Sequence, residues 1–252
     1  AYDAEATDKA SMELPFGQDE LIEALLAANP NTVIVLMGGG PIDMRKWQGK
    51  AKSIVQAWYP GMEGGNALAD ILFGNLIPSG KLPMTFPVKL EDSPAHKLAV
   101  TGFESLEQDY TDGIFVGYRY FDSYEVVPAF AFGHGLSYTS FGYDNLTITK
   151  EDGTVKLSVD VTNTGDVKGA EVVQVYVKDD EANLERPAKE LKAFQKVKLE
   201  PGASQSLTFE LDEDAFSYYD DKQNKWVLEP GTFTILVGSS SRDIRQEGQF
   251  TW

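Results

Sequence analysis

The chain has 252 residues and a formal net charge of −17, which argues against nucleic acids and anionic membranes as partners. Its hydrophobic content of 42% is typical of a globular protein, and the length allows one large domain or two ordinary ones. The sequence contains no cysteine, so disulfides, thiolate metal sites and cysteine nucleophiles are excluded. No apolar run is long enough to span a bilayer.

The first part of the chain alternates between helical and extended patterns. The spacing predicts helices over Gln18–Ala28 and Glu63–Phe73, and strands over Thr32–Met37 and Ser53–Trp58. Both strands are apolar runs suited to burial on both faces. The alternation of helix and strand along the chain predicts that the two strands are parallel and are joined by right-handed crossovers. The expected buried face of the first helix is Leu21, Ile22, Leu25 and Leu26.

A run of glycines, Gly38–Gly40, follows the first strand and is closed by Pro41. Glycines after a strand can cradle a phosphate when they lead into a helix with free backbone amides. Here the proline follows directly and no helix clearly begins. The sequence therefore favours a tight strand-end turn that lines a pocket, with nucleotide binding as the minor alternative.

From about Tyr143 the hydrophobic period changes from helical to two. Short alternating segments separated by turn residues are typical of an antiparallel β-sandwich. The sequence predicts an α/β domain with its connecting loop over residues 1–138 and a β-sandwich over residues 139–252. The expected inward-facing residues are Val155, Leu157, Val159, Val161, Val173, Val175, Val177, Leu207, Phe209, Leu211, Phe233, Ile235 and Val237.

Several long motifs stand in a fixed order along the chain. They are Gln56–Asn66, Ala67–Asn75, Pro78–Pro87, Gly117–Asp122, Phe132–Thr139, Arg186-Pro187, Lys189-Glu190-Leu191 and Pro201-Gly202. Together they closely resemble the C-terminal portion of family 3 glycoside hydrolases, the family of many β-glucosidases. The resemblance implies a partial three-layer α/β sandwich with a mainly parallel sheet, followed by a fibronectin type III-like antiparallel β-sandwich.

The resemblance also narrows the choice of catalytic residue. Most glycosidases use two carboxylates, and this chain has 39 acidic residues to choose from. In the family, a glutamate at a fixed short spacing before a Leu-Pro dipeptide is the general acid/base, which implies this role for Glu5 before Leu14-Pro15. Lys9 stands where arginine is usual. Without the resemblance, Glu5 reads as a solvated acid near the chain terminus.

The second carboxylate is expected outside this chain. In the family the nucleophile is an aspartate on a (β/α)8 barrel, and the sequence has no room for such a barrel. The leading strands of the α/β domain are also expected to precede Glu5. The chain thus resembles the rear portion of a larger enzyme, whether a cleavage product, one subunit of a split enzyme or a piece made for expression.

Four aromatic residues are candidate sugar-binding groups, because sugars stack their apolar faces on aromatic rings. They are Trp58, Tyr59, Tyr118 and Tyr120. Most aromatics are core residues, but Trp58 ends a predicted parallel strand, where ligands usually bind. His134, between two glycines, is expected to be structural. No histidine or carboxylate cluster has metal-ligand spacing, so neither a metal nor another cofactor is expected.

Two function classes follow from these observations. The first is the acid/base-bearing portion of a retaining, exo-acting β-glucosidase that takes a β-glucoside or oligosaccharide and works with a barrel-containing chain or domain. The second is a non-catalytic module that binds carbohydrate or stabilises a partner. Linkage and aglycone preference stay open, and a periplasmic or secreted location is favoured over a cytoplasmic one.

Overall fold

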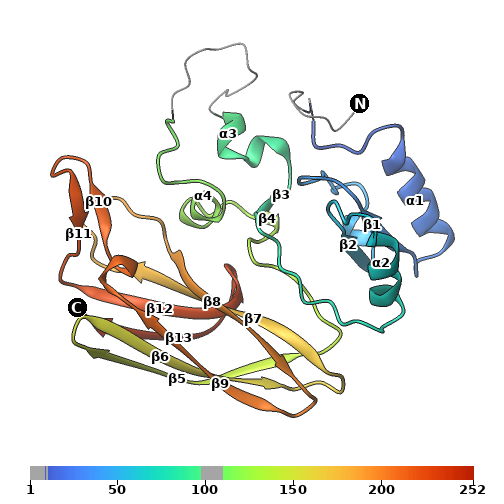
Figure 1. Cartoon of the computed structure of the whole chain (residues 1–252). Coiled ribbons are helices and arrows are strands. Elements are labelled where there is room, and N and C mark those ends of the chain that lie inside the picture. The colour runs from blue at the N-terminus through green and yellow to red at the C-terminus, as the bar shows by residue number, and fades with distance from the viewer. Residues whose placement is uncertain (1–8, 10, 98–109) are drawn as a thin grey trace. The chain divides into compact units, whose positions relative to one another are not determined.

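The computed structural model describes residues 9, 11–97 and 110–252 (Figure 1). The chain divides into two compact units. The α/β unit comprises Ala1–Leu76, Phe86–Gly113 and Val127–Phe130, and the sandwich unit comprises Ile77–Thr85, Ile114–Val126 and Ala131–Trp252. The chain therefore passes between the units several times before the long strands of the sandwich begin.

The α/β unit contains the helices and strands predicted from the first part of the sequence. Helix α1 (Gln18–Ala28), strand β1 (Val33–Leu36), strand β2 (Ser53–Gln56) and helix α2 (Gly64–Leu72) follow one another. β1 and β2 pair in parallel, as predicted, with Val33 opposite Ser53. Its other elements are η1 (Gln48–Lys50), β3 (Phe86–Pro87), η2 (Leu90–Asp92), α3 (Pro94–Lys97) and β4 (Pro128–Phe130), of which β3 and β4 pair antiparallel.

Burial in the α/β unit is one-sided, and the prediction that both faces of its strands are buried is wrong for β1. Ile34 and Leu36 are buried, whereas Val33 is exposed. Likewise α1 leaves Leu21 and Leu25 exposed. In the described part of the chain this sheet has only two strands, so few elements are present to cover its second face.

The sandwich unit is built from two antiparallel sheets (Figure 1). One sheet has the order β5-β6-β9 and the other the order β13-β12-β7-β8. Antiparallel strands can bury one face and expose the other, which matches the period-two pattern of the sequence. The strands are β5 (Phe141–Glu151), β6 (Thr154–Asn163), β7 (Gly169–Asp179), β8 (Glu190–Leu199), β9 (Ser204–Leu211), β12 (Thr232–Ser240) and β13 (Asp243–Thr251).

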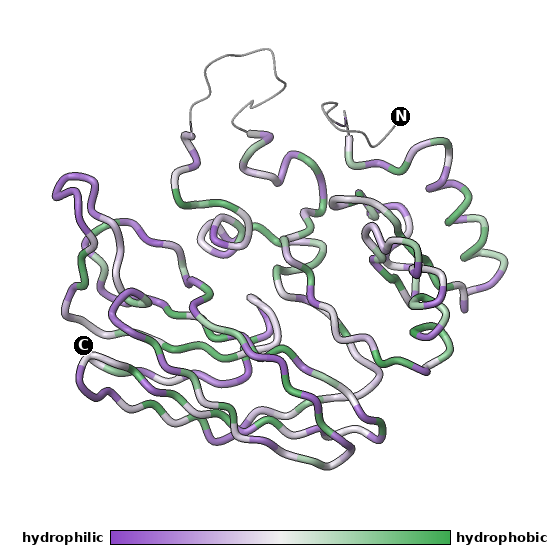
Figure 2. The backbone as a smooth tube through the Cα atoms, viewed as in Figure 1, coloured by the Kyte–Doolittle hydropathy of each residue, from purple (hydrophilic) through white to green (hydrophobic). Residues whose placement is uncertain are grey.

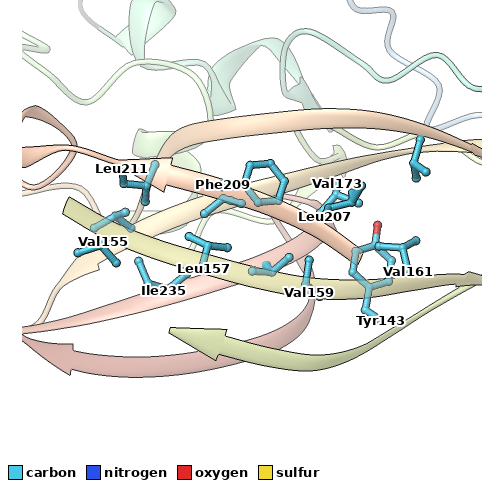
Figure 3. Packing of buried hydrophobic residues seen from close by; sticks show 14 of the residues in the cluster. Tyr143, Val155, Leu157, Val159, Val161, Val173, Leu207, Phe209, Leu211 and Ile235 are labelled. Atoms are coloured by element: carbon cyan, nitrogen blue, oxygen red, sulfur yellow. The ribbon is translucent and has the colours of Figure 1, made fainter. Parts of the chain in front are cut away.

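The core of the sandwich lies between the inner faces of these two sheets (Figure 3). Every inward-facing residue predicted from the alternation is buried there. Along β6, for example, Val155, Leu157, Val159 and Val161 are almost fully inaccessible to solvent. The same alternation of apolar and polar residues is visible along the strands in Figure 2. Each fully buried aliphatic side chain contributes about 1.5–3 kcal/mol, which makes this core the main source of stability in the unit.

A short helix, α4 (Tyr118–Ser123), is held to the sandwich unit by Arg242, which follows β12. The Nη2 atom of Arg242 donates to the carbonyl oxygens of Phe121 and Val126, at 2.8 and 2.9 Å. Its Nε atom lies 2.7 Å from Oδ1 of the buried Asp122, and Lys189 pairs with Oδ2 at 2.8 Å. These charge-assisted contacts fix the helix that carries two of the predicted sugar-binding tyrosines. The remaining elements of the unit are η3 (Glu213–Ala215), β10 (Tyr218–Asp220) and β11 (Lys225–Val227).

Candidate functional site

The predicted acid/base, Glu5, lies outside the described residues. The segment that follows it is described from residue 11 and is tied to the loop after β1. The backbone N–H of Asp43 donates to the carbonyl oxygen of Met12 at 2.9 Å. The loop of residues 41–47 therefore holds the chain at Met12, within the α/β unit.

A buried hydrogen bond fixes the same loop to the start of α1. Leu14-Pro15 leads through Phe16 and Gly17, both with positive φ, into the first turn of the helix. Asp19 in that turn is buried and accepts a hydrogen bond from Nε1 of the fully buried Trp47 at 2.7 Å. A carboxylate at a helix N-terminus also interacts favourably with the helix dipole. The chain is thus anchored at Met12, before Leu14-Pro15, and at Asp19, after it.

These anchors border a shallow cavity of about 310 Å³. Its lining is entirely charged: Glu13, Asp19, Asp43, Arg45 and Lys46. Nε of Arg45 donates to both carboxylate oxygens of Asp43, at 2.9 and 3.0 Å, and these hydrogen bonds hold the pKa of Asp43 below its usual value. An ionised carboxylate tied to a guanidinium is a poor proton donor. Asp43 is therefore held in its ionised form and is not a candidate proton donor.

The loops that follow β1 and β2 lie side by side. The N–H of Ala57 donates to the carbonyl of Leu36, the last residue of β1, at 2.8 Å, which continues the parallel ladder one residue beyond β2. Nε2 of Gln56 donates to the carbonyl of Gly38 at 3.2 Å. A Cβ atom at Gly39 would lie 2.8 Å from the hydroxyl oxygen of Tyr59, so this glycine permits a close approach. Gly39 therefore has a packing role at this edge of the sheet.

Trp58 and Tyr59 are brought together on the loop after β2. The predicted strand was expected to include Trp58, but β2 ends at Gln56, and Trp58 has a φ of 55°. A bulky residue in this left-handed region is strained, and such strain concentrates at functional sites. The Trp58 ring is half-buried and meets Phe86 edge-on, with 6.1 Å between centroids. Tyr59 is 70% exposed.

Tyr118 and Tyr120 are brought together on α4 in the sandwich unit, where both are half-buried. The Tyr118 ring stacks on Phe132 with centroids 4.7 Å apart, and its hydroxyl oxygen accepts a hydrogen bond from the N–H of Leu191 at 2.7 Å. The Tyr120 ring packs against the Tyr124 ring, with 5.0 Å between the ring centroids. Both rings therefore take part in internal packing, and their role in sugar binding stays a prediction.

Sequence reasoning did not single out the loop of residues 41–47. The available signal was the pair of charged residues Asp43 and Arg45, which come directly after the strand-end glycine run. Ligands of parallel sheets bind outside the carboxyl ends of the strands, so charges at this position are informative. In the described residues, no group of three or more histidine, aspartate or glutamate side chains could hold a metal ion, and no helix is long and apolar enough to cross a membrane.

Comparison with known proteins identifies the chain's family. Residues 1–138 match the glycosyl hydrolase family 3 C-terminal domain, and residues 171–241 match a fibronectin type III-like domain. The chain belongs to glycoside hydrolase family 3. The family resemblance and the fold class predicted from the sequence are both confirmed.

The related enzymes are considerably longer than this chain. A β-glucosidase of Bacteroides ovatus is 47% identical over 96% of the chain, which covers 33% of that relative. An exo-α-(1→6)-L-arabinopyranosidase of Bifidobacterium breve is 42% identical over 98% of the chain, and the match covers 32% of that relative. The crystal structure of a family 3 β-glucosidase from Bifidobacterium adolescentis superposes with a TM-score of 0.93 at 43% identity, covering 98% of the chain and 37% of that structure. The chain spans about a third of the length of the curated relatives it matches.

Proposed function

We propose that this chain is the acid/base-bearing portion of a retaining, exo-acting β-glucosidase that removes terminal non-reducing β-D-glucosyl residues. The observation that carries the proposal is the match over nearly the whole chain to a β-glucosidase about three times as long. A barrel domain or chain outside these residues supplies the nucleophilic aspartate. The substrate is a β-glucoside or an oligosaccharide.

Glu5 is the proposed general acid/base. It protonates the glycosidic oxygen in the first step and activates water in the second, which is the division of labour in retaining glycosidases. Its spacing to Leu14-Pro15 supports the assignment. Two contacts downstream support it further, because they fix the chain at Met12, which bonds to Asp43, and at Asp19, which bonds to Trp47.

The surface of the α/β unit supports the proposal of a further portion. Its large apolar side chains Phe16, Met37, Met62 and Phe73 are between 62% and 103% exposed. Large exposed apolar side chains are what a contact with another domain or chain would cover. The barrel-bearing portion is the proposed occupant.

Trp58 and Tyr59 are proposed to stack against the sugar, and Tyr118 and Tyr120 are kept as further candidates. The position of Trp58 and Tyr59 beyond a parallel strand supports their role, and Tyr59 offers a largely exposed ring. The hydroxyl of Tyr118 is already occupied by a backbone donor, so this residue is proposed to offer its ring alone.

The test is a Glu5→Ala variant in the enzyme completed by its barrel. A general acid matters most when the leaving group is poor, so cleavage of alkyl glucosides should fall about 10²–10⁴-fold, far more than cleavage of activated aryl glucosides. Azide should restore part of the rate and yield a β-glycosyl azide, because it attacks the α-linked enzyme intermediate without base assistance.

Two controls accompany the Glu5→Ala experiment. Glu13→Ala removes a nearby carboxylate from the charged cavity and should leave the leaving-group dependence unchanged. Aryl α-L-arabinopyranoside, tested beside aryl β-D-glucoside, addresses the specificity named for the Bifidobacterium breve relative. Wild-type rates of Glu5→Ala on poor leaving groups would refute the acid/base assignment. A preference for the arabinopyranoside would refute the substrate assignment.

A further inference from the structure

The hairpin of β10 and β11 presents two aromatic rings to solvent. Tyr219 and Trp226 lie opposite each other in the antiparallel register, with ring centroids 5.7 Å apart and planes at 74°. Tyr219 is 48% exposed and Trp226 is 64% exposed. Figure 1 shows the hairpin as a projection at the edge of the sandwich. A tryptophan this exposed on an ordered hairpin calls for an explanation beyond core packing.

The opposite face of the hairpin already fixes it to the sandwich unit. The hydroxyl of Tyr218 donates to Oε1 of Glu229 at 2.8 Å, and the guanidinium of Arg186 lies over the Tyr218 ring at 5.7 Å. The turn is closed by Asp220, whose Oδ1 accepts the N–H groups of Lys222 and Gln223 at 2.9 and 3.0 Å. The exposed aromatic pair therefore stands on a preorganised support.

The size of the aromatic pair decides what kind of ligand fits it. An aromatic side chain can bury about 150–250 Å² of surface area in a contact. Two half-exposed rings thus fall well below the ~800 Å² per partner that a stable protein interface buries. A surface of one or two rings instead matches one or two sugar residues, whose axial C–H groups form an apolar face and whose hydroxyls form a polar rim.

The charge of the hairpin favours an uncharged ligand. Residues 218–227 contain two aspartates and two lysines, so their formal charges cancel in a chain of net charge −17. The hydroxyl of Tyr219 donates to Oδ1 of Asn224, which places polar groups beside the rings. Apolar faces with neighbouring hydrogen-bonding groups are the chemistry that recognises a neutral glycan.

We propose that Tyr219 and Trp226 form a stacking site for a β-linked glucan chain. In a β-linked glucosyl residue the ring substituents are equatorial, so its faces are flat and can lie against the indole of Trp226. The choice of a β-glucan among neutral glycans rests on the proposed function, whereas the aromatic site stands on the hairpin itself. Such a site would keep the protein on a polymer whose chain ends it shortens.

The test is native electrophoresis of the 252-residue chain through gels that contain a soluble β-glucan. Wild type should be retarded, and Trp226→Thr should weaken binding about tenfold by removing the ring while keeping a β-branched residue in the strand. Trp226→Phe should keep part of the retardation, which separates loss of the ring face from disruption of the hairpin. The matched control is Phe194→Thr, because Phe194 is 68% exposed on β8 of the same unit and should not matter.

Three results would overturn the proposal. They are an unretarded wild type, equal retardation of wild type and Trp226→Thr, and equal retardation by an α-linked dextran. A fourth contrary result is a dimer found by sedimentation and lost in Trp226→Thr, because a second copy of the chain would then occupy the surface. The assay requires no hydrolysis, so an inactive protein can still bind glucan and an active one can fail to bind. Failure of this proposal is thereby distinguishable from failure of the proposed function.

Discussion

Nε1 of Trp47 lies 2.7 Å from Oδ1 of Asp19, and both side chains are buried in the α/β unit. The bond joins the first turn of α1 to the loop after β1, across 28 positions of sequence. Lys46 adds a looser charge contact to Oδ2 of Asp19 at 3.7 Å. A buried carboxylate is stable only when such partners satisfy it, so this pair ties the first turn of α1 to the loop after β1.

The first prediction concerns this pair. Trp47→Phe should destabilise the protein by about 1–3 kcal/mol, because it leaves a buried acceptor without its donor. In a double-mutant cycle with Asp19→Ala, which removes the acceptor, denaturant unfolding should give a coupling energy of about 0.5–3 kcal/mol. Strict additivity of the two changes would show that the hydrogen bond contributes nothing.

The second prediction compares two neighbouring glycines at the start of α2. A Cβ atom at Gly64 would lie 2.6 Å from Cβ and Cγ of Pro60, and a rigid ring cannot move aside easily. Gly64→Ala should therefore cost about 1–3 kcal/mol. Gly65 has no heavy atom within 4 Å of the same position, so Gly65→Ala should be neutral or stabilise by up to about 1 kcal/mol. Thermal unfolding of both variants checks the contrast, and equal midpoints would contradict it.

The third prediction concerns pH and His134. Burial lowers the pKa of His134, nearby Lys81 lowers it further, and Asp243 partly opposes them. The unfolded chain therefore binds a proton at this residue more readily than the folded protein does, and stability should fall as the pH drops below the unfolded value of about 6.5.

The pH effect is measured as the unfolding free energy of wild type and His134→Gln between pH 8 and 5.5. Wild type should lose stability relative to the variant across this range, since glutamine does not titrate. Gly65→Ala serves as the control, because it introduces no titratable group and should shift the free energy equally at every pH. Parallel curves for wild type and His134→Gln would contradict the prediction.

The fourth prediction concerns dependence on the barrel. Because the proposed nucleophile lies outside these residues, the purified 252-residue chain should not hydrolyse an aryl β-glucoside. Mixing it with the barrel-bearing portion should restore release of the aryl alcohol, measured by absorbance. Turnover by the chain alone that disappears in Glu5→Ala would mean that a second carboxylate of this chain acts as the nucleophile.

The sequence by itself determined four of the sandwich strands, β6, β7, β9 and β12, because period-two alternation is a local record of burial. Val155 to Val161 on β6 and Phe233 to Val237 on β12 were recognisable without any contact information. The sequence also determined the bounds of α1, because the apolar pattern of this helix stops before Asn29-Pro30. Glu5 was reached only through family resemblance, because one acid among many has no local signature.

Only the tertiary structure decided which predicted elements are covered and which side chains meet. The sequence could not show that α1 leaves Leu21 exposed, because burial depends on neighbouring elements that are distant along the chain. Nor could it show the left-handed backbone at Trp58, where surrounding packing overrides local preference. The engagement of Tyr118 with Leu191 and the bond between Asp19 and Trp47 join positions far apart in sequence. Such contacts are set by the fold as a whole, which local patterns do not record.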